Sequence, residues 1–127
     1  MCGIAGFFDL NNAAPRLDTE SVVTRQIATL HHRGPDAQAT FAGPGVGLAH
    51  ARLSIIDLSA AANQPMFDAT GKIGVVFNGE IYNFQEVREH LEARGHVFST
   101  NSDTEVIVEG YAEWGVDVLD RLQRAFV

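Results

Sequence analysis

The sequence predicts a single α+β domain, and the main reason is the order of its strand-like and helix-like segments. Short apolar segments typical of strands fall at the start and in the middle of the chain, whereas amphipathic segments fall in the first third and at the end. This mixed order favours α+β layering over strict βαβ alternation. A length of 127 residues is enough for one domain with its own hydrophobic core.

The N-terminal third is predicted to contain a strand followed by a helix. Residues 3–8 are apolar and are stopped by Asp9, as in a buried strand. A helix is expected from Asp18, which can act as its N-cap, to a stop signal at Gly34-Pro35. The apolar positions that recur with helical spacing are Val23, Ile27 and Leu30.

The middle of the chain is predicted to be mostly extended. Residues 38–42 and 46–56 are candidate strands, separated by the turn signal Gly43-Pro44-Gly45. Residues 58–65 are rich in small side chains and are predicted to form a loop. Residues 73–77 are predicted to form a further strand, halted by an Asn-Gly pair.

The last third is predicted to be mainly helical. Asn83 can cap a helix with Glu86 at its third position, and Gly95 is expected to end that helix. Its inward-facing residues are expected to be Val87 and Leu91. Residues 97–99 are predicted to form a short strand.

Residues 102–105 have the spacing of a capping box, which predicts a second helix in this region. The residues expected to share one face of that helix are Ile107, Tyr111 and Trp114. A further helical turn or two is expected from Asp117 toward Arg124, and residues 122–127 resemble the start of another strand, cut short.

Composition excludes several classes of protein. Nine Lys and Arg against sixteen Asp and Glu give a net charge of −7, and Lys72 is the only lysine, so nucleic acid is a poor candidate partner. The apolar run 4–8 is too short for a membrane span and lacks a basic segment before it, so we expect no membrane insertion and a cytoplasmic protein. The five histidines lack ligand spacing to one another, so no metal is expected.

Cys2 is the only cysteine, and its position next to the initiator Met1 gives it two interpretations. If Met1 is removed, one residue carries both a thiol nucleophile and a free α-amine that can act as base, as in N-terminal nucleophile enzymes. Taken alone, a cysteine here is more often an inert small apolar residue on a strand. The surrounding motifs reverse that balance.

Six blocks of the sequence resemble, in order, those of class II glutamine amidotransferase domains, and most closely the glutaminase domain of glutamine-dependent asparagine synthetase. They are Met1-Cys2-Gly3-Ile4-Ala5-Gly6, His32-Arg33-Gly34-Pro35-Asp36, residues 49–58, Gln64-Pro65-Met66, Phe77-Asn78-Gly79-Glu80-Ile81-Tyr82-Asn83 and Ser102-Asp103-Thr104-Glu105. The resemblance implies a four-layer α/β/β/α sandwich of the N-terminal nucleophile hydrolase type, here incomplete at the C-terminus.

The resemblance also implies a reaction and its catalytic residues. Cys2 is expected to hydrolyse glutamine and release ammonia, while Asn78 and Gly79 form the oxyanion hole through a side-chain amide and a backbone N–H. An Asn-Gly pair after a strand is otherwise more often just a turn.

Glutamine carries an α-carboxylate and an α-ammonium, and the matching residues have the opposite charges. Arg52 is expected to clamp the carboxylate, whereas Asp103, with Glu80 nearby, is expected to hold the ammonium. An acidic residue at the start of a helix is also favoured by the helix dipole, so both roles of Asp103 can coexist. Leu53, Ile55 and Ile56 either shape the pocket through their backbone or are simply core residues.

The expected partner is a synthetase domain or subunit that consumes the ammonia. Any ATP and Mg²⁺ are expected only in that part, because this chain contains no phosphate-binding glycine loop and no cofactor is expected within it. Asparagine synthesis is the leading acceptor chemistry, with other carboxylates such as sugar acids open, and a non-catalytic glutamine-binding or regulatory remnant is the alternative function. Missing strands would leave a sheet edge unpaired, so an isolated fragment is expected to be marginally stable or to form a homo-oligomer.

Overall fold

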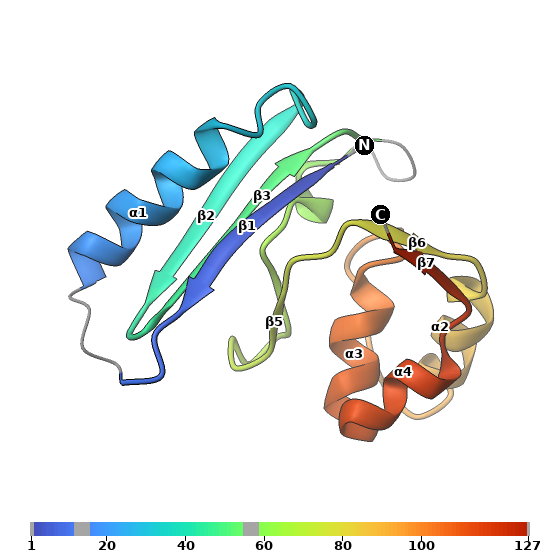
Figure 1. Ribbon diagram of the computed structural model, residues 1–127. Helices are drawn as coiled ribbons and strands as arrows, with labels where there is room; N and C mark the ends of the chain where they lie inside the picture. Colours follow the sequence, from blue (N-terminus) through green and yellow to red (C-terminus); the bar gives the residue numbers. More distant parts are fainter. Residues whose placement is uncertain (1, 12–15, 55–58, 127) are drawn as a thin grey trace. The chain divides into compact units, whose positions relative to one another are not determined.

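The computed structural model describes residues 2–11, 16–54 and 59–126, and the chain forms two compact units. The first comprises Met1–Ser54, Asn63–Pro65 and Val76–Asn78, and the second comprises Ile55–Ala62, Met66–Val75 and Gly79–Val127. Both contain helices and antiparallel strands (Figure 1), which confirms the α+β class. The four-layer sandwich stays a prediction.

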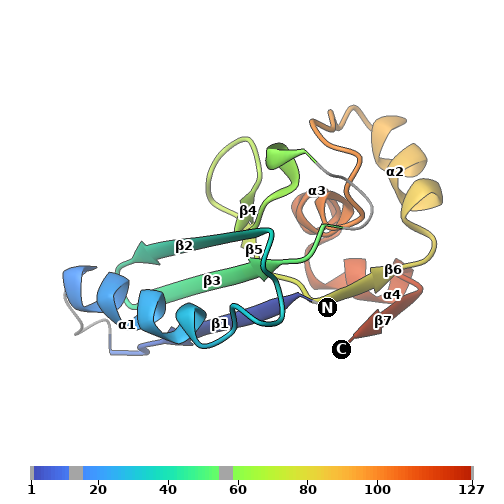
Figure 2. The ribbon, with the colours of Figure 1, turned by 90° about the horizontal axis from the view of Figure 1, so that it is seen from above.

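The first unit is a three-stranded antiparallel sheet with a helix on one face. Its strands are β1 (Gly3–Phe8), β2 (Ala37–Gly43) and β3 (Val46–Arg52), in the order β1-β3-β2. Helix α1 (Arg16–Ala28) lies along this sheet in two perpendicular views (Figures 1 and 2). The β2–β3 turn has Gly45 at φ 68°, a left-handed conformation that glycine adopts without strain.

Small residues on β3 let α1 approach the sheet closely. Val23 and Ile27 of α1 pack on Ala49 and Ala51, and all of them are buried, as the helical spacing predicted for the two α1 residues. Both predicted ends of this helix were wrong. It starts at Arg16, which places Asp18 inside its first turn, and it ends at Ala28, before Leu30 and the predicted stop at Gly34-Pro35. A carboxylate in the first turn still interacts favourably with the helix dipole.

The second unit contains two short antiparallel ribbons and a short 3₁₀ helix, η1 (Ala60–Ala62). Strand β4 (Met66–Phe67) pairs with β5 (Gly74–Val75), and β6 (Gly79–Ile81) pairs with β7 (Arg124–Phe126). The strand predicted over 73–77 is therefore only two residues long. Strand β6 was not predicted, because its partner lies more than forty residues away in the chain.

The helices of the second unit follow the predicted order. Helix α2 (Phe84–Glu92) buries Val87 and Leu91, as expected, and Gly95 with φ 98° lies just beyond its end. Asn83 occupies the N-cap position but makes no cap hydrogen bond. Its side chain instead accepts from the N–H of Gln123 (2.8 Å) and donates to the carbonyl of Arg121 (2.9 Å), so it joins α2 to the segment before β7.

Helix α3 (Glu105–Trp114) buries a different face from the one predicted. Val106 and Val108 are in the core, and Gly110 packs against Val118 so closely that a Cβ would overlap that side chain. Tyr111, expected to face inward, is 45% exposed. The 3₁₀ helix η2 (Gly115–Asp117) and helix α4 (Val118–Arg121) follow and supply the predicted final helical turns.

The segment before α3 is irregular, so the strand predicted at 97–99 was wrong. Val97 is 84% exposed, and the segment is anchored through polar groups instead. His96 lies between Glu109 (2.6 Å) and Glu113 (2.9 Å) of α3, and these hydrogen bonds raise its pKa. Polar contacts of this kind do not produce a periodic pattern of apolar residues, so they could not be predicted from the sequence.

Glu105 also holds the segment before α3 in place. Its contacts differ from those of the capping box that was predicted over residues 102–105. Its carboxylate accepts the backbone N–H groups of Ser99 and Thr100, both at 2.8 Å, together with their hydroxyls at 3.0 and 2.6 Å. It is 6% exposed, so this charge is satisfied by four donors in a buried place.

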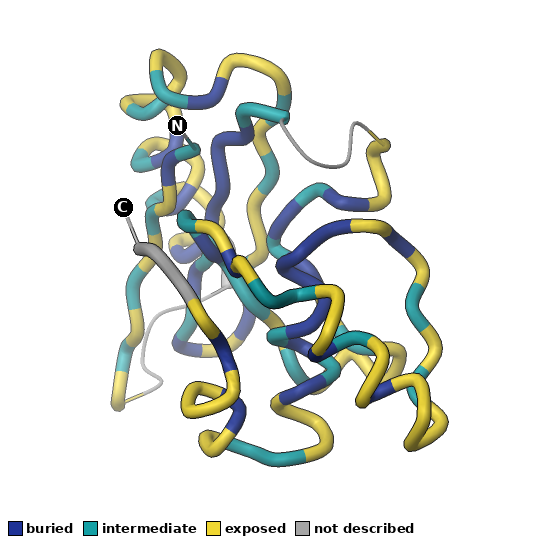
Figure 3. Tube along the Cα trace, turned by 90° about the vertical axis from the view of Figure 1, so that its right-hand side faces the viewer, coloured by how far each residue is buried: buried dark blue, intermediate teal, exposed yellow. Residues whose placement is uncertain are grey.

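Strand β1 is confirmed, but the burial predicted for it was wrong, because exposed residues alternate along it, with Ile4 45% and Phe8 71% exposed. Figure 3 shows buried and exposed positions interleaved along the described part of the chain. No helix among the described residues is both long and apolar enough to cross a bilayer.

We predict that Glu105→Ala lowers the free energy of unfolding by about 2–4 kcal/mol, because the donors of Ser99 and of the buried Thr100 lose a charged acceptor. Urea denaturation measures the change. Glu86→Ala, which removes an exposed carboxylate of α2, is the matched control and is expected to stay within about 0.5 kcal/mol of wild type. Equal losses in the two variants would contradict an anchoring role for Glu105.

Candidate active site

The pairing of β1 with β3 places Cys2 beside the end of β3. Gly3 is paired with Ala51 at this end of the β1–β3 ladder. Cys2 precedes Gly3, and Arg52 and Leu53 follow Ala51. The backbone N–H of Leu53 lies 3.3 Å from the Cys2 Sγ, and the Leu53 carbonyl oxygen lies 3.5 Å from the same sulfur. Cys2 is half-buried, and its thiol contacts the main chain of Leu53, which is also half-buried.

The His-Arg-Gly-Pro-Asp block braces Cys2 and the end of β3. Arg33 donates its Nε–H to the Cys2 carbonyl at 3.2 Å. A Cβ at Gly34 would overlap the main chain of Ala51, so only glycine fits there. Gly34-Pro35 was predicted only as a helix stop, and the contacts of this block with Cys2 and Ala51 were not predicted.

Asp36 completes the brace on the far side of the β3 end. Its N–H donates to the Arg52 carbonyl at 3.0 Å, and its carboxylate accepts the N–H of Ser54 at 2.8 Å. The backbone of residues 52–54 is thereby held on both sides, which fixes the strand end that contacts the thiol.

Arg52 ends β3 on the face opposite to the α1 core. Ala49 and Ala51 face α1, and side chains alternate along a strand, so His50 and Arg52 share the other face. Arg52 is 8% exposed, and its Nη1 donates to the Asn63 Oδ1 at 2.5 Å. The guanidinium is therefore largely removed from water and directed by a neutral amide oxygen.

His50 is a buried imidazole that the sequence analysis did not single out. It is 1% exposed, and its pKa is lowered to about 4, mainly by burial and to a smaller extent by the positive charge of Arg52. The Phe77 main chain opposes this by hydrogen bonding, yet neither ring nitrogen meets the geometry of a full hydrogen bond to the described residues. The ring is neutral at pH 7, which excludes a cationic role for it there.

Asn78 and Gly79 do not form the turn that an Asn-Gly pair commonly makes. Asn78 is half-buried in an irregular segment of the first unit, and Gly79 is the first residue of β6 in the second unit. Gly79 is not among the glycines with positive φ. It therefore has strand-like backbone.

Asp103 and Glu80 are brought together within the second unit. The Ile81 N–H donates to Asp103 Oδ2 at 3.0 Å, and Asp103 is 6% exposed in the turn just before α3. Burial raises the pKa of Asp103, the negative charge of Glu80 raises it further, and hydrogen bonds from main-chain N–H groups oppose both effects. A cation bound here would relieve the repulsion between the two carboxylates.

Two of the predicted residues, Ile55 and Ile56, lie outside the described residues. Among the described ones, no group of three or more His, Cys, Asp or Glu side chains could hold a metal ion. Asn63 and Gln64 were not predicted as contacts of the site, because their role depends on the distant residues Arg52 and Phe77 that their loop meets.

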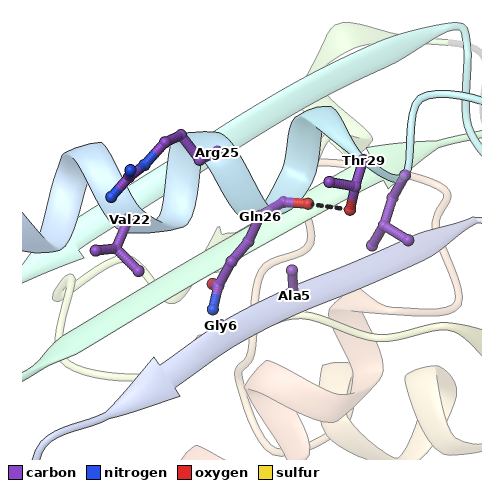
Figure 4. Close-up of a pocket in the computed structure, with 7 residues that line it drawn as sticks. Ala5, Gly6, Val22, Arg25, Gln26 and Thr29 are labelled. Carbon is purple, nitrogen blue, oxygen red and sulfur yellow. Dashed lines mark hydrogen bonds between the residues drawn. The ribbon is translucent and has the colours of Figure 1, made fainter.

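A separate hollow lies between α1 and β1 (Figure 4), and none of the predicted site residues lines it. In Figure 4 the Thr29 hydroxyl donates to the Gln26 carbonyl at 2.7 Å, an ordinary helix-end contact. The lining residues are Ala5, Gly6, Val22, Arg25, Gln26, Thr29 and Leu30. The residues that line this hollow include no cysteine and no carboxylate.

A family model described as a glutamine amidotransferase domain matches residues 1–127. The chain therefore belongs to the glutamine amidotransferase domain family, whose fold type is the N-terminal nucleophile hydrolase.

The curated relatives that match this chain include glutamine-hydrolysing asparagine synthetases. The chain is 38% identical over 126 residues to glutamine-hydrolysing asparagine synthetase 1 of Bacillus subtilis, which covers 99% of this chain and 20% of that protein. It is 40% identical over 126 residues to asparagine synthetase B of Escherichia coli and 45% identical over 129 residues to asparagine synthetase 1 of Arabidopsis thaliana, covering 99% of this chain in each case and 22% and 21% of those proteins. The chain thus spans about a fifth of the length of these relatives.

We predict that His50 makes the protein less stable in acid. Its pKa is about 4 when folded and near 6.5 when unfolded, so the unfolded state binds more protons between these values. Stability is full above pH 6.5 and falls by about 3 kcal/mol as the pH drops toward 4. His50→Gln should remove this part of the pH dependence, as measured by urea denaturation across the pH range.

The exposed His90 provides the control, since His90→Gln should leave the acid-side slope as in wild type. An unchanged slope in His50→Gln would mean that the imidazole is not held neutral by burial.

Proposed function

We propose that this chain hydrolyses glutamine to glutamate and ammonia, with the Cys2 thiol as nucleophile once Met1 is removed. The observation that carries the proposal is the contact of the Cys2 sulfur with the Leu53 N–H at 3.3 Å, at the strand end that also carries Arg52. Cys2, the proposed nucleophile, and Arg52, the proposed carboxylate-binding cation, each lie one residue beyond the paired residues Gly3 and Ala51. Family membership over the whole chain supports the same reaction.

The chemistry proceeds through a thioester. The α-amine of Cys2 takes the thiol proton, the sulfur attacks the side-chain amide carbon of glutamine, and the carbonyl oxygen becomes an oxyanion. The side-chain amide of Asn78 and the N–H of Gly79 donate hydrogen bonds to this oxyanion. The protonated amine then gives its proton to the leaving nitrogen, which departs as ammonia, and water hydrolyses the thioester to glutamate.

Two charged groups recognise the rest of the substrate. The planar guanidinium of Arg52 can bind the α-carboxylate through two parallel hydrogen bonds, which a lysine cannot reproduce. The carboxylates of Asp103 and Glu80 attract the α-ammonium, and a bound cation would offset the repulsion that raises the pKa of Asp103. Leu53 contributes main-chain groups, and Ile55 and Ile56 are proposed to do the same.

We propose further that the ammonia is passed to a synthetase part of the protein, which uses ATP and Mg²⁺ to amidate a carboxylate. The names of the relatives, glutamine-hydrolysing asparagine synthetases that are about five times as long as this chain, support aspartate as the acceptor. This chain carries no glycine loop for a triphosphate. ATP chemistry is therefore assigned to the synthetase part alone.

The N-terminal mechanism predicts that mature protein lacks Met1 and that a glutamine-analogue electrophile labels Cys2 with one molecule per chain. Intact-mass and peptide mass spectrometry measure both. Cys2→Ser should lose nearly all glutaminase activity while ammonia-dependent synthesis by the intact protein persists. Retained Met1 with full glutaminase activity would contradict the mechanism, because the proposed base would be an amide.

The division of roles predicts different kinetics for two substitutions. Asn78→Ala should mainly lower kcat, since one oxyanion donor contributes about 2.7–4 kcal/mol to the transition state. Arg52→Lys should mainly raise KM for glutamine, because it weakens binding of the α-carboxylate in the ground state and the transition state alike. Steady-state glutaminase assays separate the two, and one shared signature would refute the assignment.

A further inference from the structure

The loop residues Asn63, Gln64 and Pro65 belong to the first unit, although the residues on both sides of them belong to the second. Two successive side chains of this loop make hydrogen bonds within the first unit. Asn63 accepts a hydrogen bond from the Arg52 guanidinium, and Gln64 Oε1 accepts one from the Phe77 N–H, both at 2.5 Å. Each therefore contacts a segment that carries a proposed substrate-binding residue.

The Gln64 contact fixes the main chain immediately before Asn78. Gln64 is 7% exposed and Phe77 is 8% exposed, so the hydrogen bond is shielded from water. A buried N–H that loses its acceptor is costly, which holds the Phe77 peptide in one orientation. The buried His50 ring is also close to the Phe77 main chain.

We propose that Gln64 is a positioning residue for the oxyanion hole. By holding the Phe77 N–H, it sets the backbone direction from which Asn78 presents its side-chain amide. Asn63 has the corresponding task for the Arg52 guanidinium, so one short loop aligns the group that stabilises the oxyanion and the group that binds the carboxylate. This inference rests on the proposed glutaminase function.

The two neighbouring residues should therefore produce different kinetic effects. A donor displaced by about 1 Å can cost about a hundredfold in rate, whereas loss of alignment at Arg52 weakens substrate binding throughout the reaction. A loop that served folding alone would lower the amount of active protein, and would change neither kcat per active site nor KM selectively.

The test uses glutaminase kinetics of the intact protein, with active sites counted by labelling of Cys2. Gln64→Met removes the acceptor at similar size and should lower kcat about 10- to 100-fold, with KM changed by less than about threefold. Gln64→Glu should restore most of kcat, because a carboxyl group offers an acceptor oxygen in either protonation state. Asn63→Ala should raise KM for glutamine about 5- to 20-fold, with kcat nearly unchanged.

Amide hydrogen exchange of Phe77 gives a readout that does not depend on activity. Exchange should be at least about tenfold faster in Gln64→Met than in wild type, and Gln64→Glu and Asn63→Ala should leave it slow. An active wild type in which Gln64→Met keeps its kcat per labelled site would overturn the positioning role and leave the glutaminase function standing. A wild type with labelled Cys2 and no glutamine hydrolysis would overturn both.

Discussion

The antiparallel pairing of β1 with β3 is the constraint on which the site in the first unit depends. Its register, from Gly3 opposite Ala51 to Phe8 opposite Val46, leaves the Cys2 thiol against the Leu53 main chain. A slip of one residue would turn every side chain of β1 to the other face of the sheet. The small side chains of Ala49 and Ala51 on the same strand β3 admit α1 on one face of the sheet.

Buried polar side chains are the second recurring feature, and most of them bind backbone. Gln64 accepts from Phe77, Asp103 from Ile81, and Glu105 from Ser99 and Thr100. Such contacts fix loops that have little apolar surface of their own, because a buried donor without an acceptor is costly. The proposed functional residues lie beside these anchored loops, which suits chemistry that needs fixed donors.

His50 is a buried polar side chain that differs from these residues. Its ring nitrogens lack full hydrogen bonds to the described residues, and burial keeps it neutral next to Arg52. A cationic imidazole there would repel the guanidinium and compete for a substrate carboxylate. A neutral ring leaves Arg52 as the positive group on that face of β3.

The sequence by itself determined strand β1, the buried residues of α1 and α2, and the α+β class, because local apolar periodicity and turn residues encode them. Motif blocks also identified Cys2, Arg52, Asn78 and Asp103 as candidates. Only the tertiary structure decided that Glu105 anchors the segment before α3, that β6 pairs with β7, and that Asn63 and Gln64 contact Arg52 and Phe77. These contacts join residues through single polar groups, several of them distant in the chain, and such groups leave no periodic trace in a sequence.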